Sequence, residues 1–200
     1  STTTVYGIGS TWTLGSAINI SVGGLTFAYG SFNTSTSNYA ITCANLTSSN
    51  SNVRTVSLNG SALTLSGTVT FTTSTNLTFT AGTSAISIST ASATFSGGGQ
   101  TFYNVSFTNA AASGNINIGG ANTFNTLAFT GRTTVGITSI LFTSSQTITT
   151  LTIPAGTAAA YRTLLAANTL GTTQTLTVTT LTAGATDVDF RDITIAGAAA

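Results

Sequence analysis

A short phrase recurs along this chain. Residues 101–108 read TFYNVSFT and residues 123–130 read TFNTLAFT, and the phrase returns more loosely as TITTLTIP at 147–154 and DFRDITIA at 189–196. The first two copies start 22 residues apart. If that period continues, Phe102, Phe124 and Phe190 occupy the same position of their repeat units. A repeat of about 20–25 residues, built of alternating apolar and hydroxyl side chains, predicts stacked strand units rather than a closed globule.

Within each unit, apolar and hydroxyl residues alternate, as in VTFT at 69–72 and LTFT at 77–80, and Gly-containing turn signals separate the runs. This pattern predicts strands of about 4–6 residues with one buried face and one solvent-exposed face. Residues 157–170 are rich in Ala and Leu and fit either a helix or a strand that follows a turn.

Short strands at this spacing fit a β-solenoid or a β-sandwich, and the 22-residue recurrence favours the solenoid. We therefore predict an all-β protein, a parallel β-solenoid wound as a right-handed β-helix with about 20–25 residues per coil. A β-sandwich is the alternative fold.

The first 38 residues follow the period poorly and are rich in aromatic side chains: Tyr6, Trp12, Phe27, Tyr29 and Phe32. We predict an N-terminal cap or small β module at residues 1–38 and a β-solenoid rod at residues 39–200, since a solenoid needs its end strands covered. Core packing or capping is the favoured role of these aromatics, and stacking on sugars is the alternative.

Composition excludes several classes of function. The chain has four Arg and three Asp, with no Lys, Glu, His or Met, and its net charge of +1 predicts no general attraction to nucleic acid or anionic membranes. No apolar run approaches the length of a membrane-spanning helix, so no membrane insertion is expected.

Cys43, the single cysteine, alternates in step with Ile41 and reads as a small buried hydrophobe, with a reactive or intermolecular thiol as the alternative. Because the chain starts at Ser1, we expect it to be processed or part of a longer chain.

Five phrases carry a resemblance to a known group of proteins. They are YAIT at 39–42 followed by NVRTVSL at 52–58, the run TFSGGGQTFYNVSFT at 94–108, and NTFNTLAFTG at 122–131 with DVDFRDIT at 187–194. They resemble the Ser/Thr/Gly-rich β-helix proteins of bacteriophage tail fibres, related virion proteins and bacterial surface proteins. The resemblance covers about residues 39–195. It implies an architecture and a setting and transfers no catalytic residue.

All three acids lie within residues 187–192. Asp187 and Asp189 should share the solvent-exposed face with Arg191, which predicts an Asp189–Arg191 ion pair. The change of apolar parity between Phe190 and Ile193 predicts a bend or bulge near Asp192. We expect Asp192 to accept local backbone amides there. The alternatives are a calcium site, whose usual spacing is not matched, and a glycosidase pair formed by Asp187 and Asp192.

The remaining candidates read as structural. Residues 97–99 are a Gly triplet without a following Lys, which predicts a turn rather than a phosphate cradle. The arginines are expected on the surface, capping carbonyl groups: Arg54, Arg132, Arg162 and Arg191. Thr-x-Thr runs read as solvated strand faces, with ice binding as a remote alternative: Thr68/Thr70/Thr72 and Thr173/Thr175/Thr177/Thr179. The Asn-x-Ser/Thr sequons, which include Asn45, Asn76 and Asn104, are expected by chance in a chain so rich in Ser and Thr.

These observations predict a structural protein, not an enzyme, with no catalytic, cofactor-binding or metal-ligating residue assigned. The expected role is a rigid rod in a phage tail fibre, tail spike or other virion appendage that attaches to a host surface. Expected partners are further copies of the chain in a homotrimer or higher polymer, other virion or filament proteins and host surface polysaccharide. The alternative is a subunit of a bacterial or archaeal extracellular filament or adhesin at the cell surface, and a polysaccharide-degrading tail spike is a remote alternative.

Overall fold

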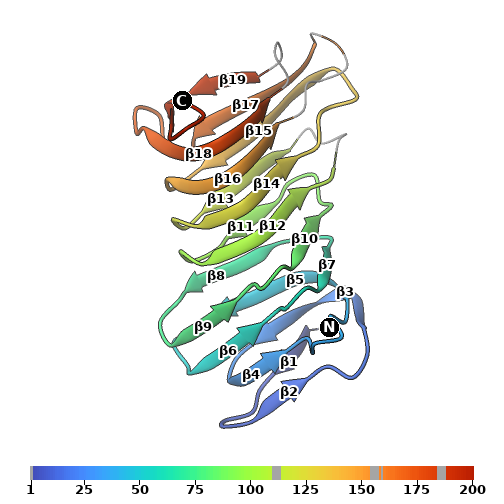
Figure 1. Ribbon diagram of the computed structural model, residues 1–200. Helices are drawn as coiled ribbons and strands as arrows, with labels where there is room; N and C mark the ends of the chain where they lie inside the picture. The colour runs from blue at the N-terminus through green and yellow to red at the C-terminus, as the bar shows by residue number, and fades with distance from the viewer. Residues whose placement is uncertain (1, 110–113, 154–157, 159, 184–187) are drawn as a thin grey trace.

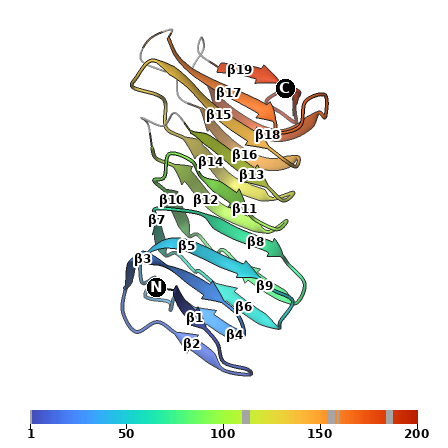
Figure 2. The same ribbon diagram turned by 180° about the vertical axis from the view of Figure 1, so that it is seen from behind.

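The protein is a parallel β-solenoid of about eight turns in a computed structural model (Figure 1). The structure describes residues 2–109, 114–153, 158, 160–183 and 188–200. Every strand pair in this part of the chain is parallel, and each strand pairs with strands of the neighbouring turns. In Figure 1 the chain climbs from the N-terminus, with β9 (Leu77–Thr80) running left to right in front and β8 (Val69–Thr73) right to left behind. The solenoid is therefore right-handed, and Figure 2 shows the same path from behind.

Three faces enclose the core, and we name them A, B and C. Face A contains β1 (Thr2–Val5), the C-terminal parts of β3 (Ile18–Phe27) and β5 (Ile41–Ser49), β8, β11 (Thr94–Ser96), β13 (Asn115–Gly119), β15 (Gly136–Phe142), β17 (Tyr161–Ala167) and β19 (Val188–Arg191). Face B contains the N-terminal parts of β3 and β5, β7 (Ala62–Leu65), β10 (Ala85–Ile88), β12 (Thr101–Phe107), β14 (Thr123–Phe129), β16 (Gln146–Ile153), β18 (Gln174–Ala183) and β20 (Ile193–Ala196). Face C contains only β2 (Thr11–Thr13), β4 (Gly30–Asn33), β6 (Arg54–Ser57) and β9.

The core is a set of apolar columns, because alternation turns every second side chain inward and parallel pairing stacks equivalent residues. Phe102 lies beside Phe124 across the β12–β14 pair, with ring centroids 5.8 Å apart, and Phe107 stacks on Phe129 at 5.2 Å. These four rings are buried. The stacked-coil fold inferred from the repeated phrase is confirmed, and the β-sandwich alternative is wrong.

The assignment of Phe190 to the Phe102 column is wrong. Phe190 pairs with Leu165 on face A, whereas Phe124 continues through Ile148 to Val178 on face B. The turns have unequal lengths, since Thr123 pairs with Thr147 and Thr147 with Thr177, so multiples of 22 lose register. Phe190 is 46% exposed in an end strand.

The helical reading of residues 157–170 is also wrong, because Tyr161–Ala167 is a strand paired with β15. Residues 154–157 and 159 lie outside the described part of the chain. The β-branched and aromatic neighbours that β15 supplies favour a strand over a helix of Ala and Leu.

The N-terminal strands belong to the same ladders as the rest. Thr2 pairs with Gly24, and Ile18 pairs with Ile41 across the proposed boundary at residue 38. The hydroxyl of Thr34 donates to the carbonyl of Leu58 at 2.7 Å and fastens this boundary to the next turn. Residues 2–38 therefore form the first turns of the solenoid, and their role as a cap stays a prediction.

Face C ends where the Gly triplet begins. A Cβ atom at Gly98 (φ 64°) would overlap the carbonyl oxygen of Phe71, and one at Gly97 would overlap the side chains of Phe102 and Asn122. Glycine therefore lets the chain pass from β11 directly to β12 across the inside of the corner. Above this point the described turns have faces A and B alone.

Candidate functional site

The acidic cluster forms an ion pair, but with a different partner from the one predicted. Arg162 donates two hydrogen bonds to the carboxylate of Asp189, from Nε to Oδ2 at 2.8 Å and from Nη2 to Oδ1 at 2.6 Å. The predicted Asp189–Arg191 pair is wrong, because β17 and β19 lie side by side and Arg162 approaches from the neighbouring turn. The Arg162 hydrogen bond lowers the pKa of Asp189 below its usual value.

The predicted bend at Asp192 is confirmed. This residue has φ 55° and separates β19 on face A from β20 on face B. Its Oδ2 accepts the backbone N–H of Gly171 at 3.0 Å, a contact with the previous turn rather than the local amide predicted. Arg191 donates to the carbonyl of Ala167 at 2.9 Å, and its Nε lies 3.9 Å from Asp192 Oδ2.

The calcium and glycosidase alternatives both depend on Asp187, which lies outside the described residues. Within the described ranges, no three His, Cys, Asp or Glu side chains come close enough together to hold a metal ion. Asp189 and Asp192 are held by Arg162 and by Gly171 respectively. The described contacts of these two acids are those of a structural corner.

Arg54 is one of two arginines whose burial the sequence did not indicate. It is 1% exposed and starts β6 on face C. All five of its N–H groups meet neutral oxygens: the Ser48 hydroxyl and carbonyl, and the carbonyls of Asn52, Thr73 and Thr75, at 2.5–3.1 Å. Burial lowers the pKa of Arg54. The capping of carbonyls was predicted, and the surface position was wrong.

Arg132 repeats this chemistry in a loop of the upper turns. It is buried and donates to the carbonyls of Thr134 and Val135 and to the hydroxyl of Thr138. In a chain without surplus carboxylates, these two arginines satisfy backbone oxygens at corners where no strand pairing reaches them.

Cys43 is buried in β5 at the point where the strand turns from face B to face A. Burial raises the pKa of the Cys43 thiol to about 11, so the reactive thiolate is disfavoured at neutral pH. The interpretation as a small buried hydrophobe is confirmed.

The Gly triplet forms a turn, as predicted. The backbone N–H of Gly99 donates to Asn122 Oδ1 at 3.1 Å, and Gln100 N–H donates to the carbonyl of Gly97. These bonds use amides that a phosphate would otherwise need.

The other structural candidates are distributed over the solenoid. Phe27 and Phe32 pack in the core with ring centroids 5.0 Å apart, whereas Trp12 is 53% exposed in the edge strand β2. On face B, Thr101 pairs with Thr123, Thr123 with Thr147 and Thr147 with Thr177, so one column of threonines crosses four strands. Asn76, in one of the sequons, is exposed and donates to the carbonyl of Ser51.

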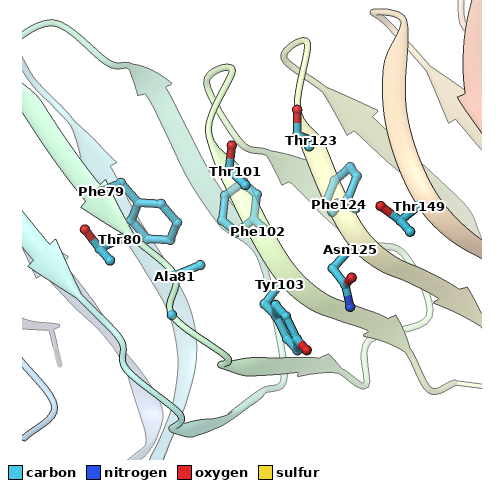
Figure 3. A pocket seen from close by; sticks show the side chains of 11 residues that line it. Phe79, Thr80, Ala81, Thr101, Phe102, Tyr103, Thr123, Phe124, Asn125 and Thr149 are labelled. Atoms are coloured by element: carbon cyan, nitrogen blue, oxygen red, sulfur yellow. The ribbon is translucent and has the colours of Figure 1, made fainter. Parts of the chain in front are cut away.

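A groove of about 470 Å³ lies beside the end of face C (Figure 3). Residues 79–82 of β9 and the turn after it form one wall, and residues 101–103, 123–125 and Thr149 of face B form the other. The rings of Phe79 and Phe102 lie 5.0 Å apart at its base, and Tyr103 is 37% exposed. All of these lining residues are uncharged. No motif in the sequence indicates this groove, because its position depends on which turn loses face C.

Comparisons with family models, curated proteins and solved structures gave no match. No helix in the described residues is long and apolar enough to cross a membrane.

Proposed function

We propose that this chain is a structural, non-catalytic rod in a phage tail fibre, tail spike or other virion appendage. The observation that carries the proposal is the continuous parallel ladder, which links β1 through successive turns to β19 and β20. Each turn hydrogen-bonds to the next along the whole strand length, so bending the rod would break several bonds at once. Such a rod transmits position and force from one end to the other.

The chemistry of the described side chains supports a mechanical role. The two described acids are engaged at a structural corner, and the chain has no His to serve as a general base. Attachment to a host surface belongs to the same proposal, with further copies of the chain and other appendage proteins as partners. The exposed strands at both ends, β2 and β19, are consistent with contacts to further chains.

An antibody raised against the purified chain tests this proposal by immunogold electron microscopy of the source culture. We expect gold on virion appendages, at a constant distance from the capsid, and none after the antibody is absorbed with purified chain. Gold on cell-surface filaments, with bare virions, would overturn the proposal in favour of the filament or adhesin alternative.

A further inference from the structure

The upper edge of β9 is an unpaired strand edge in the middle of the rod. The sheet of face C runs β2-β4-β6-β9 and stops there, although faces A and B continue for several more turns. The backbone N–H of Arg54 binds the carbonyl of Asn76, and that of Leu58 binds the carbonyl of Thr80. Because alternate residues of a strand bond to opposite neighbours, the N–H and C=O of Phe79 point to the open edge.

The chain itself is prevented from covering this edge. The backbone crosses the inside of the corner at Gly97 and Gly98, and a side chain at either position would overlap Phe71 or Phe102. The place of a fifth face C strand is left as the groove between β9 and β12 (Figure 3).

The edge is short but lacks the charged residues, proline and bulge that often block strand addition. The segment Leu77-Thr78-Phe79-Thr80 has no charge and no proline, and it has no bulge in its pairing with β6. Natural edge strands usually carry such features, because an open edge of this kind pairs with other chains. The half-buried Phe79 is the last strand-paired member of the inward column of Phe32 and Val56. The ring of Phe102 packs against it from face B without strand pairing between β9 and β12.

We propose that the β9 edge accepts an extended, uncharged segment of a partner protein as the fifth strand of face C, by β-strand addition. The strands already present indicate the pattern of the added strand. Each of β4, β6 and β9 has an apolar residue in the column of Phe79 and a small polar residue on either side of it. The uncharged lining of the groove favours a partner segment without charged side chains. This inference is independent of the proposed virion setting.

The test uses an acetylated and amidated peptide with the sequence of residues 75–82, TNLTFTAG, which carries the chain's own face C pattern. Titration into the ¹⁵N-labelled protein should shift the amide signals of Phe79 and Ala81 and slow their hydrogen exchange at least about tenfold. The control peptide has the same sequence with N-methyl groups on alternate amides, and it should leave both amides unchanged because it cannot form the ladder.

Two variants separate the edge amide from the ring. Phe79→Leu keeps the N–H and should still bind the peptide, whereas Phe79→Pro removes the N–H that faces the groove and should weaken binding at least about tenfold. Unchanged Phe79 and Ala81 amides at millimolar peptide would overturn the proposal. It would equally be overturned by shifts confined to Tyr103 and Asn125, which indicate a ligand on the groove wall. The N-methylated peptide keeps the test decisive on the wild-type protein if Phe79→Pro fails to fold.

Discussion

The lower turns of this solenoid have three faces and the upper turns have two, although both are built from the same alternating apolar and hydroxyl residues. The lower turns enclose a wider core, and a buried arginine supports the corner where β6 begins. The upper turns are closed by long face B strands and by glycine at the corner. The apolar pattern makes a coil in both regions, and the corner residues decide how many faces it has.

The largest expected effect tests the arginine corner of the lower turns. Arg54→Leu removes five hydrogen bonds and leaves buried carbonyls unsatisfied, so we expect a loss of about 4 kcal/mol in the free energy of unfolding. Urea unfolding measures the loss. Hydrogen exchange should accelerate in β4, β6 and β9 before β14 and β16. Uniform acceleration over both regions would show that the two kinds of turn are one cooperative unit.

The next effect tests the glycine corner that ends face C. Gly98→Ala should cost more than about 3 kcal/mol, because the new Cβ meets the carbonyl oxygen of Phe71 and the residue has a positive φ. Gly99→Ala is the matched control. It has φ 76°, and its added Cβ would meet only the carbonyl oxygen of Ala121 at an ordinary contact distance of 3.8 Å, so it should cost about 1–2 kcal/mol. Equal losses for the two variants in thermal or urea unfolding would contradict the close approach at Gly98.

Cys43 provides a smaller, pH-dependent effect in the lower core. Its pKa is raised to about 11 in the folded protein from 9.0, so the unfolded chain ionises first as the pH rises. Stability from this residue is therefore complete below about pH 9 and is lost as pH climbs toward 11, by about 1 kcal/mol at pH 10. The measurement is the difference in unfolding free energy between wild type and Cys43→Ala from pH 8 to 10. A difference that stays constant over this range would contradict burial of the thiol.

The smallest effect lies in the upper turns, at the exposed ion pair. Arg162 lowers the pKa of Asp189, so the pair contributes above the ordinary Asp pKa of 3.8, and its contribution is lost as pH falls through the lowered value. NMR titration of the Asp189 carboxyl carbon should show an upward pKa shift in Arg162→Gln. Arg191→Gln is the control and should leave the Asp189 midpoint where it was.

Much of the fold follows from the sequence because the repeated phrase and its alternation act along the whole strand length. Phe102 and Phe124 were placed correctly, since one turn of 22 residues separates them. Phe190 was misplaced, because turns of other lengths intervene and loop length leaves no periodic signal. The turn at which face C ends was not predicted, because its four strands resemble those of the other faces in sequence.

Candidate residues were harder to place than strands. Cys43 alternates with Ile41 within one strand, so its burial follows from local pattern. Arg54 occupies a position where charge predicts exposure, and its buried acceptors come from Ser48, Thr73 and Thr75 at a corner. Arg162 and Asp189 meet across turns, a contact that depends on the register of β17 and β19.

The most direct test of the coiled fold is a disulfide across neighbouring turns. Thr101→Cys with Thr123→Cys, in a Cys43→Ala background, places two thiols at paired positions of β12 and β14, about 5 Å apart between Cα atoms. Thr101→Cys with Thr147→Cys places them two turns apart and is the control. We expect rapid oxidation of the first pair in the folded protein and none of the second. Failure of the first pair to oxidise, or equal oxidation of both, would contradict the stacking of successive turns.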